Sequence, residues 1–326
     1  MSRIYEALQK AESERKSERR EPEPLVPDPS ASAGPFSAAA LAEHDMRTME
    51  PVVTEPVGIQ PIGVQPYRES FAPPTRGDFF DLNQIVPHHW SLSLDQLPAL
   101  LERGPAVEQF RSLRSRIFEL RDISPLKTIL ISSGLPQEGK SFVSTNLALS
   151  LARHKNSKVL LIDGDMRRYT LHQILGCEST PGLADYLAGK ATITEVMQRP
   201  ETSQITNHAA QHALPNLAFI AGGNGGDKAA DLSGSPRFGE LIQLVSPHFD
   251  WIIVDSSPVL PVSDAVNLAR FCDGVLLVAR SGVTKFPVAQ RAQSELKAAH
   301  ILGFVLNAVI EAPEVGGYYS YDAKSQ

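Results

Sequence analysis

Three features are scarce in this 326-residue sequence: cysteines, long apolar runs and any excess of basic residues. Its two cysteines, Cys177 and Cys272, lie far apart and outside any C-x-x-C pair, which argues against a disulfide framework or a zinc site. No apolar run approaches the length that spans a bilayer, and the first residues lack the apolar core of a signal peptide. The net charge of −6 gives no electrostatic footprint for nucleic acid. We therefore expect a soluble chain that works in the reducing cytoplasm without nucleic acid.

Proline and serine are concentrated near the N-terminus, where we expect no packed core. Residues 18–96 form a Pro-rich segment that predicts a disordered linker in coil and polyproline II conformations. Before it, residues 1–17 carry apolar side chains at helical spacing, which predicts a short amphipathic helix that either docks onto a partner or frays. An α/β domain at residues 97–315 and a flexible tail at residues 316–326 complete the predicted organisation.

The most specific pattern is at residues 134–141, Gly-Leu-Pro-Gln-Glu-Gly-Lys-Ser, which fit the P-loop pattern G-x-x-x-x-G-K-[ST] without a mismatch. An apolar run precedes these residues and a helical stretch begins at Phe142, so the context is strand, loop and helix. Such a turn directs backbone N–H groups at a bound anion. Lys140 supplies a charge for the β- and γ-phosphates, and the Ser141 hydroxyl can occupy one Mg²⁺ coordination position. A chance Gly-Lys-Ser in a surface turn is the blander alternative.

Three aspartates follow two further apolar runs. Residues 158–162 predict a buried parallel strand that ends at Asp163 and Asp165, and residues 251–254 predict another that ends at Asp255. Ligands of open α/β sheets bind at the carboxyl ends of the strands. Asp163 and Asp165 are therefore placed to hold hydrated Mg²⁺ or to take a proton from an attacking hydroxyl, and Asp255 to hold Mg²⁺ as a Walker B aspartate. An ordinary strand-end turn is the alternative for each of them.

The other apolar runs complete the predicted fold. With strands at 217–221, 274–278 and 304–307 and a crossover helix at 286–299, the chain predicts a mostly parallel sheet with helices on both faces. Residues 222–226, Gly-Gly-Asn-Gly-Gly, predict a mobile loop near the site. Asn307 ends the last strand, where its amide is able to read the edge of a nucleotide base.

Two surfaces outside the P-loop carry further hypotheses. Glu108, Arg111 and Arg114 share one face of a predicted helix, either as a solvated salt-bridge ladder, the simpler interpretation, or as a subunit contact. Three tyrosines lie in a glycine-hinged C-terminal stretch that has almost nothing apolar to bury them: Tyr318, Tyr319 and Tyr321. They are either accessible phosphoacceptors or part of a tail without a role.

Taken together, residues 132–141, 163–167, 252–258 and 318–321 resemble the bacterial tyrosine kinases of capsular and exopolysaccharide synthesis. The resemblance implies a P-loop NTPase-like fold, ATP and Mg²⁺ as cofactors, and phosphorylation of the three C-terminal tyrosines, commonly on a neighbouring subunit. It also makes Glu108, Arg111 and Arg114 similar to the ring-forming motif of that family, which reverses the preference for a solvated ladder. Leu135 stands where the related partitioning and division-site ATPases carry a signature lysine, which argues against those relatives.

The motifs and the resemblance give one set of expected site residues and partners. The catalytic residues are Lys140, Asp163, Asp165 and Asp255, and the metal site is Ser141, Asp165 and Asp255. The nucleotide contacts are Gly134, Pro136, Gln137, Glu138, Gly139, Lys140, Ser141, Phe142, Arg167 and Asn307. Expected partners are a membrane chain-length or co-polymerase protein, further copies of the chain in a ring, and a tyrosine phosphatase, at a cytoplasmic location peripheral to the inner membrane. The alternative function is a regulatory ATPase or an ATP-switched scaffold of the polysaccharide machinery.

Overall fold

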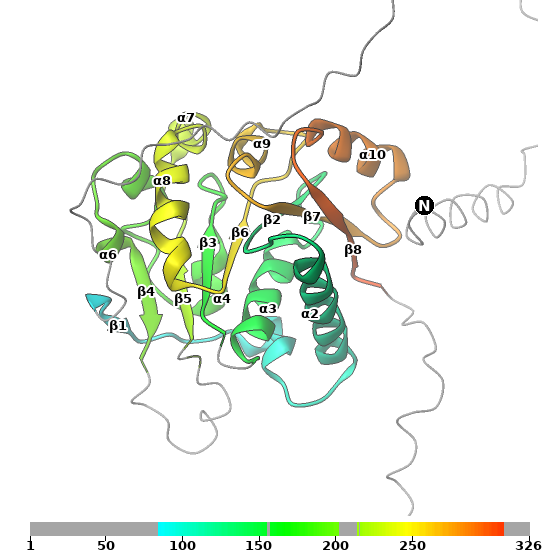
Figure 1. Ribbon diagram of the computed structural model, residues 1–326, viewed down its shortest axis with the longest axis horizontal. Helices are drawn as coiled ribbons and strands as arrows, with labels where there is room; N and C mark the ends of the chain where they lie inside the picture. Colours follow the sequence, from blue (N-terminus) through cyan, green and yellow to red (C-terminus); the bar gives the residue numbers. More distant parts are fainter. Residues whose placement is uncertain (1–83, 155–156, 202–213, 215, 310–326) are drawn as a thin grey trace, which may run out of the picture. The chain divides into compact units, whose positions relative to one another are not determined.

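The computed structural model describes residues 84–154, 157–201, 214 and 216–309 (Figure 1). The predicted N-terminal helix, most of the predicted linker and the tyrosine tail lie outside these residues. The described residues form one sheet of eight strands in the order β1-β4-β5-β3-β6-β2-β7-β8. Only the pairing of β4 with β5 is antiparallel among these strands. No helix in the described part is long and apolar enough to cross a membrane.

Strands and helices alternate along most of the chain. The strands are β1 (Pro87–His88), β2 (Thr128–Ser133), β3 (Val159–Asp163), β4 (Met197–Pro200), β5 (Leu217–Ile220), β6 (Trp251–Asp255), β7 (Gly274–Arg280) and β8 (Ile301–Asn307). The helices are α2 (Pro105–Ile123), α3 (Lys140–Ala152), α4 (Leu171–Leu175), α5 (Leu183–Leu187), α6 (Ile193–Val196), α7 (Ala229–Ser233), α8 (Pro236–Val245), α9 (Asp264–Ala269) and α10 (Phe286–Glu295), with short 3₁₀ turns η2 (Leu94–Gln96), η3 (Pro98–Leu100), η5 (Gly226–Lys228) and η6 (Ser246–His248). This confirms the mostly parallel α/β sheet with helices on both faces.

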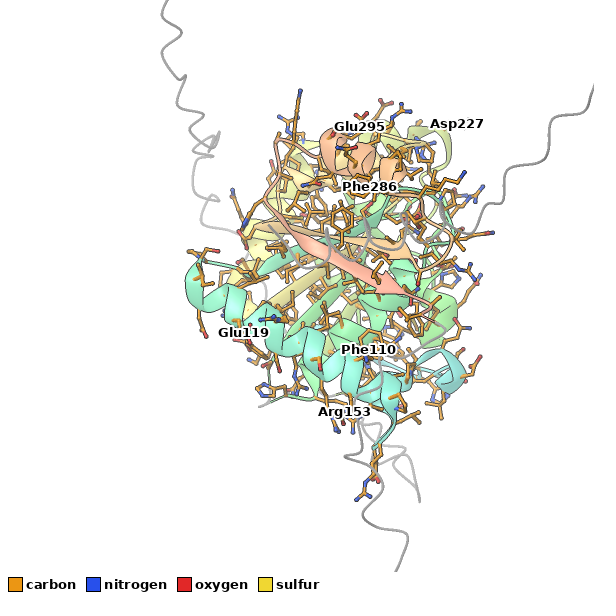
Figure 2. The ribbon with its side chains drawn as sticks, turned by 90° about the vertical axis from the view of Figure 1, so that its right-hand side faces the viewer. Phe110, Glu119, Arg153, Asp227, Phe286 and Glu295 are labelled. Carbon is orange, nitrogen blue, oxygen red and sulfur yellow. The ribbon has the colours of Figure 1, made fainter. Side chains whose placement is uncertain are left out.

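Both faces of the central sheet are buried. In β2, Ile129 and Ile131 pack into a core with side chains of α2 and α3, whereas Leu130 between them packs into a second core with side chains of α8 and α9. Figure 2 places Phe110 and Glu119 along α2 and Phe286 and Glu295 on α10. A strand that is covered on both sides needs apolar residues at every position, because successive side chains point to opposite faces. The central strands were therefore visible in the sequence as continuous apolar runs.

The domain begins earlier than its expected boundary at Leu97. Ile85 is 1% exposed and belongs to the core beside α8, and β1 pairs in parallel with β4. Ser91 N–H donates to Gly176 O at 3.0 Å. The proline in this segment, Pro87, starts an edge strand, where a missing backbone donor is tolerated. Residues 85–96, which the sequence assigned to the linker, therefore pack with the folded domain.

The glycines of residues 222–226 permit close packing of the backbone. A Cβ atom at Gly222 would lie 2.6 Å from Tyr169 Cβ, and one at Gly225 would lie 2.9 Å from Met166 Cβ. Ala184 N–H donates to Gly222 O at 3.0 Å. The interpretation of these residues as an open, mobile loop is therefore replaced by a packed turn that lies against the chain following β3.

Candidate active site

The phosphate-binding loop, residues 134–141, joins β2 to α3 at the carboxyl end of the sheet. The chain passes through left-handed conformations at Gly139, where φ is 95°, and at Gln137, where φ is 65°. Glycine adopts such a conformation at little cost, whereas a glutamine does not. The helix α3 begins at Lys140, directly after the second glycine of the motif. The first backbone N–H groups of a helix have no partner within the helix, so this end of α3 is suited to binding an anion. The loop thus has the strand-loop-helix geometry that the sequence predicted.

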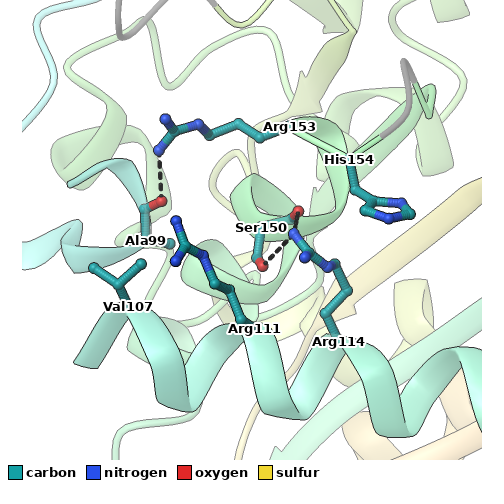
Figure 3. A pocket seen from close by; sticks show the side chains of 7 residues that line it. All are labelled: Ala99, Val107, Arg111, Arg114, Ser150, Arg153 and His154. Atoms are coloured by element: carbon teal, nitrogen blue, oxygen red, sulfur yellow. Dashed lines mark hydrogen bonds between the residues drawn. The ribbon is translucent and has the colours of Figure 1, made fainter. Parts of the chain in front are cut away.

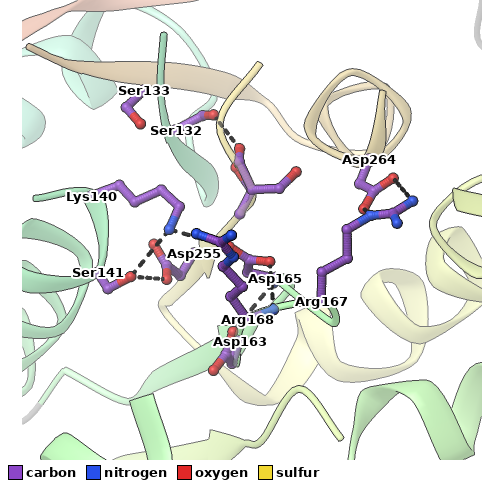
Figure 4. A network of polar contacts seen from close by, with 12 residues as sticks. Ser132, Ser133, Lys140, Ser141, Asp163, Asp165, Arg167, Arg168, Asp255 and Asp264 are labelled. Atoms are coloured by element: carbon purple, nitrogen blue, oxygen red, sulfur yellow. Dashed lines mark hydrogen bonds and ion pairs between the residues drawn. The ribbon is translucent and has the colours of Figure 1, made fainter. Parts of the chain in front are cut away.

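Four side chains from three parts of the sequence meet at this loop, and two of them, Lys140 and Ser141, belong to it (Figure 4). The Ser141 hydroxyl donates to Asp255 Oδ2 at 2.7 Å, and Lys140 Nζ lies 3.2 Å from Asp165 Oδ2. The sheet topology brings them together, because β6 lies between β2 and β3 and Asp255 is opposite Asp163 in the register. The expected catalytic and metal-binding residues therefore form one cluster at the carboxyl edge of the sheet.

Asp163 lies behind the backbone that carries Asp165. It is fully buried, and its Oδ1 accepts the Asp165 N–H at 3.2 Å while its Oδ2 accepts the Leu171 N–H at 3.1 Å. Burial, and then the negative charge of Asp255, raises the pKa of Asp163 well above its usual range. Both oxygens thus hold the turn after β3 in place, and Asp163 positions Asp165 in this conformation.

Lys140 is the cation inside a group of three carboxylates. Burial lowers the pKa of Lys140, but the charges of Asp255 and Asp165 outweigh burial and raise it. Burial raises the pKa of Asp255, against the opposing effect of Lys140. Lys140 is thus one ammonium group beside three buried carboxylates that disfavour one another's ionisation, and a further cation would favour their charged forms.

Arg167 and Asp264 form an ion pair that the sequence did not suggest. Arg167 Nε lies 2.7 Å from Asp264 Oδ2 and Nη2 lies 3.3 Å from Oδ1, so the guanidinium contacts both carboxylate oxygens. Asp264, at the start of α9, is fully buried. The pair ties the turn after β3 to α9. The sequence predicted that Arg167 contacts the nucleotide, and in this structure its guanidinium is already paired with Asp264.

Side chains on the outer side of the phosphate-binding loop contact its backbone. Asn307 Nδ2 donates to Glu138 O at 3.0 Å, and Arg280 Nη1 lies 3.5 Å from Gln137 O. Phe142 lies against Phe110 of α2, with ring centroids 5.7 Å apart. Pro136 is exposed. The Asn307 amide is thus engaged with the loop, and its expected contact with a nucleotide base stays a prediction.

Comparisons with known proteins agree with this geometry. A model of an AAA domain family matches residues 127–282. The tyrosine-protein kinase wzc of Salmonella typhimurium is 31% identical over 226 residues, which cover 68% of this chain and 30% of that protein. The solved kinase domain of the Escherichia coli tyrosine kinase ETK is 31% identical over 66% of this chain and 80% of its own, with a TM-score of 0.55. The chain belongs to the bacterial tyrosine kinase family.

The chain also resembles the solved structure of the chimerical protein CapA2B2. The two are 27% identical with a TM-score of 0.59, and the match covers 68% of this chain and 92% of the other. Bacterial tyrosine kinases such as wzc are much longer than the part that matches. The chain covers about 30% of wzc and 26% of the tyrosine-protein kinase ptk of Acinetobacter johnsonii. The likeness therefore concerns the kinase domain of this family.

The cluster fits a Mg²⁺ ion of the kind that accompanies nucleotides at phosphate-binding loops. Asp255 Oδ1 is buried and accepts no hydrogen bond from the described residues. Ser144 faces this carboxylate and lowers its pKa, but its hydroxyl donates to Ser141 O at 3.1 Å. No chelating group of three or more His, Cys, Asp or Glu side chains is found in the described part. Mg²⁺ requires no such cage, because it retains waters and binds phosphate oxygens as well.

The predicted subunit-contact residues lie on α2, away from this cluster. Glu108 and Arg111 form an ion pair one turn apart, and Arg114 Nη1 donates to Ser150 O of α3 at 2.9 Å. Arg111 and Arg114 line a pocket of about 270 Å³ together with Arg153 and His154 (Figure 3). Burial, and then the charge of Arg111, lowers the pKa of Arg114. The hollow is therefore lined by positively charged side chains, and Glu108 pairs with one of them, Arg111, from outside its lining.

Two residues of the site had no signal in the sequence. Asp264 pairs with Arg167 across 97 positions, and Thr284 donates to Glu138 across 146 positions. Asp264 follows a serine at a helix start, which is a common capping pattern and carries no hint of its partner. Thr284 lies in the turn after β7 without any motif around it. Only the fold brings Asp264 and Thr284 to the candidate site.

Proposed function

We propose that the chain is an ATP-dependent protein-tyrosine kinase that phosphorylates its own C-terminal tyrosines and regulates the synthesis or export of an extracellular polysaccharide. The observation that carries the proposal is the convergence of Lys140, Ser141, Asp165 and Asp255 on one phosphate-binding loop. Family membership supports transfer to tyrosine, since the relatives include proteins named tyrosine-protein kinase.

Each side chain has a separate task in this proposal. The backbone amides of the phosphate-binding loop and the Lys140 ammonium hold the triphosphate and stabilise charge that develops on the transferred group. Ser141, Asp165 and Asp255 hold Mg²⁺, which when bound neutralises phosphate oxygens and orients them for in-line transfer. Asp163 fixes the turn that presents Asp165. Phosphoryl transfer depends mainly on positioning and charge stabilisation, so this small set is sufficient.

The proposed acceptors are Tyr318, Tyr319 and Tyr321, which lie outside the described residues. Tyr318 follows Asn307 by eleven residues in the sequence, and Asn307 contacts the phosphate-binding loop. An extended chain covers about 3.5 Å per residue, so this distance of roughly 40 Å allows transfer within one chain or to a neighbouring one. We propose transfer to a neighbour, within a ring of identical copies.

The proposal also places the chain at a membrane through another protein. The proposed partner is a membrane chain-length or co-polymerase protein, with a tyrosine phosphatase that resets the tail. The expected location is the cytoplasmic face of the inner membrane. Co-purification of the full chain with such a membrane protein from detergent extracts, and its loss when residues 1–17 are deleted, tests this location.

The central experiment incubates purified chain with Mg²⁺ and ATP and measures intact mass and released phosphate. Mass gains that map to Tyr318, Tyr319 and Tyr321 support the kinase. Phosphate release without any mass gain supports the alternative, a regulatory ATPase or switched scaffold.

A mixing experiment separates transfer in trans from transfer in cis. One partner is Lys140→Met with its tail intact, and the other is a chain with an active loop whose three tail tyrosines are changed to Phe. Phosphate that appears on the Lys140→Met tail has come from another copy. A tail that remains unmodified in the mixture, while wild type is modified alone, excludes transfer in trans.

A further inference from the structure

A buried carboxylate lies inside the phosphate-binding loop, where its charge works against the ligand. Glu138 immediately precedes Gly139 and Lys140 and is only 3% exposed. A negative charge close to phosphates weakens their binding by coulombic repulsion. The P-loop pattern accepts any residue at this position, so phosphate binding alone gives no reason for a glutamate. The reason has to lie in its contacts.

The carboxylate of Glu138 joins the start of its own loop to the turn after β7. Its Oε2 accepts the Leu135 N–H at 2.8 Å, and its Oε1 accepts the Thr284 hydroxyl. The same Thr284 oxygen accepts the Arg280 N–H at 2.8 Å, which fixes the hydroxyl in place. Hydrogen bonds to a charged group are stronger than neutral ones. The two bonds therefore hold the loop in one conformation and attach it to β7.

A third contact attaches the loop to the end of β8. Asn307 Nδ2 donates to Glu138 O at 3.0 Å, and Asn307 O accepts the Ser281 N–H at 2.8 Å. A Cβ atom at Gly139 would lie 1.8 Å from Asn307 Nδ2, so the amide rests directly on the loop. The chain that leads to the tyrosine tail leaves the sheet at this strand. The phosphate-binding loop, the turn after β7 and the end of β8 are thus connected to one another through the side chains of Glu138, Thr284 and Asn307.

We propose that Glu138, Thr284 and Asn307 form a clamp that holds the phosphate-binding loop ready for nucleotide and ties it to the strand from which the tail departs. The proposal rests on the proposed function, since it concerns the same nucleotide site. The three are positioning residues, which act through the loop. A loop with two left-handed residues is costly to order, so holding it in place before binding raises affinity.

The clamp is tested by titrating a fluorescent ADP analogue with Mg²⁺ into the full chain. Thr284→Val removes the hydroxyl at nearly constant shape, and Glu138→Ala removes both carboxylate bonds. The loss of a hydrogen bond to a charged group corresponds to a dissociation constant about tenfold higher for Thr284→Val, which keeps the charge of Glu138. Glu138→Ala also removes the charge that repels the phosphates, so its dissociation constant should rise less than that of Thr284→Val. Glu138→Gln can still accept from Leu135 and donate to Thr284, and it removes the charge that repels the phosphates, so its dissociation constant should rise no more than about threefold.

A second threonine–glutamate hydrogen bond, away from the nucleotide site, provides a matched control. The Thr192 hydroxyl donates to Glu195 at 2.8 Å in an exposed capping box, so Thr192→Val should leave nucleotide affinity unchanged. Wild-type affinity in Thr284→Val, which leaves the charge of Glu138 in place, would overturn the clamp.

Amide hydrogen exchange of the nucleotide-free protein gives a readout that needs no nucleotide. The peptide that covers residues 134–141 should exchange faster in Thr284→Val and Glu138→Ala than in wild type, Glu138→Gln or Thr192→Val. Equal exchange in all of them overturns the clamp even if nucleotide titration fails. A wild type that binds no nucleotide, with faster exchange in the two variants, overturns the proposed function and leaves the clamp standing.

Discussion

The carboxyl edge of the sheet and the outer face of α2 both carry charged residues that the sequence singled out, but the structure treats them differently. At the edge, Lys140 and Asp255 come from distant parts of the chain and are buried together. On α2, Glu108 and Arg111 are half-exposed and pair one helical turn apart. Burying several charges is costly and calls for a ligand, whereas exposed pairs contribute little by themselves. The role of the first region can thus be tested by measuring phosphorylation and ATP hydrolysis. The role of the second can be tested only by measuring the assembly of copies of the chain.

The largest expected effect is at the buried edge. Lys140→Met removes the cation that faces the phosphates, so we expect tail phosphorylation and ATP hydrolysis to fall by about 10³-fold, as for the loss of one strong charge-stabilising donor. The loop backbone is held by β2 and α3, so the variant should stay folded. Radiolabel transfer and circular dichroism measure the two quantities.

A lysine at the opposite end of the sheet gives the matched control for this change. Lys127 Nζ donates to Ser246 O at 2.8 Å, ahead of β2. Lys127→Met should retain turnover. Wild-type turnover in Lys140→Met would end the assignment of the phosphate-binding loop.

A second effect concerns both activity and stability. Asp255→Asn should lose Mg²⁺-dependent turnover by about 10²-fold, yet stabilise the nucleotide-free protein by roughly 1 kcal/mol, which is about 3 °C in Tm for a domain of this size. Burial raises the folded-state pKa of Asp255, so the folded state holds its proton to higher pH than the unfolded state. In the wild type, the contribution of Asp255 to the free energy of unfolding is therefore fully present below the pKa that Asp255 has in the unfolded state. It falls as the pH rises from there toward the higher pKa of the folded state.

The pH dependence gives the check on that sign. The advantage of Asp255→Asn in Tm should shrink as pH falls toward the ordinary Asp pKa of about 4 and grow toward neutral pH. Thermal scans without nucleotide across that window measure it. A variant that is less stable than wild type at neutral pH would mean that the Asp255 charge is well compensated without Mg²⁺.

The third effect separates a structural from a ligand-binding role for Arg167. Arg167→Met leaves the buried Asp264 carboxylate without its pair, and an uncompensated buried charge should lower the free energy of unfolding by about 3 kcal/mol. Nucleotide affinity should change by less than about threefold, which corresponds to less than about 0.7 kcal/mol of binding free energy. Urea denaturation and nucleotide titration measure the two. The neighbouring Arg168→Met is the control, and a tenfold loss of affinity in Arg167→Met alone would instead establish the nucleotide contact predicted from the sequence.

Local patterns in the sequence were sufficient for the central strands and for the core of the site. Strands buried on both faces are continuous apolar runs, and the Lys140 and Asp255 motifs follow directly from them. Short elements such as β4 and α9 were missed, because a few residues do not establish a period. Contacts such as Glu138 with Thr284 were also missed, because the distance in sequence is large and a single threonine has no pattern.

The smallest effect on the domain itself is expected on α2. Arg111→Ala/Arg114→Ala removes an exposed ion pair and a hydrogen bond to Ser150 O, which should cost about 1 kcal/mol of stability. If α2 is a subunit contact, the same change should abolish assembly, because a head-to-tail interface that closes into a ring uses one patch at every junction. Light scattering with Mg²⁺ and ATP measures the mass of the assembly.

The helix supplies its own control for that comparison. Arg116 and Glu119 form a second exposed pair of the same spacing on α2, outside the charged hollow. Arg116→Ala should lose as little stability and keep the assembly, because Arg116, unlike Arg111 and Arg114, does not line the hollow. If both variants assemble and phosphorylate their tails as wild type does, α2 is an ordinary charged surface and transfer between copies must use another face. If both fail to assemble, charge along the whole helix drives association, and the three-residue motif has no special role.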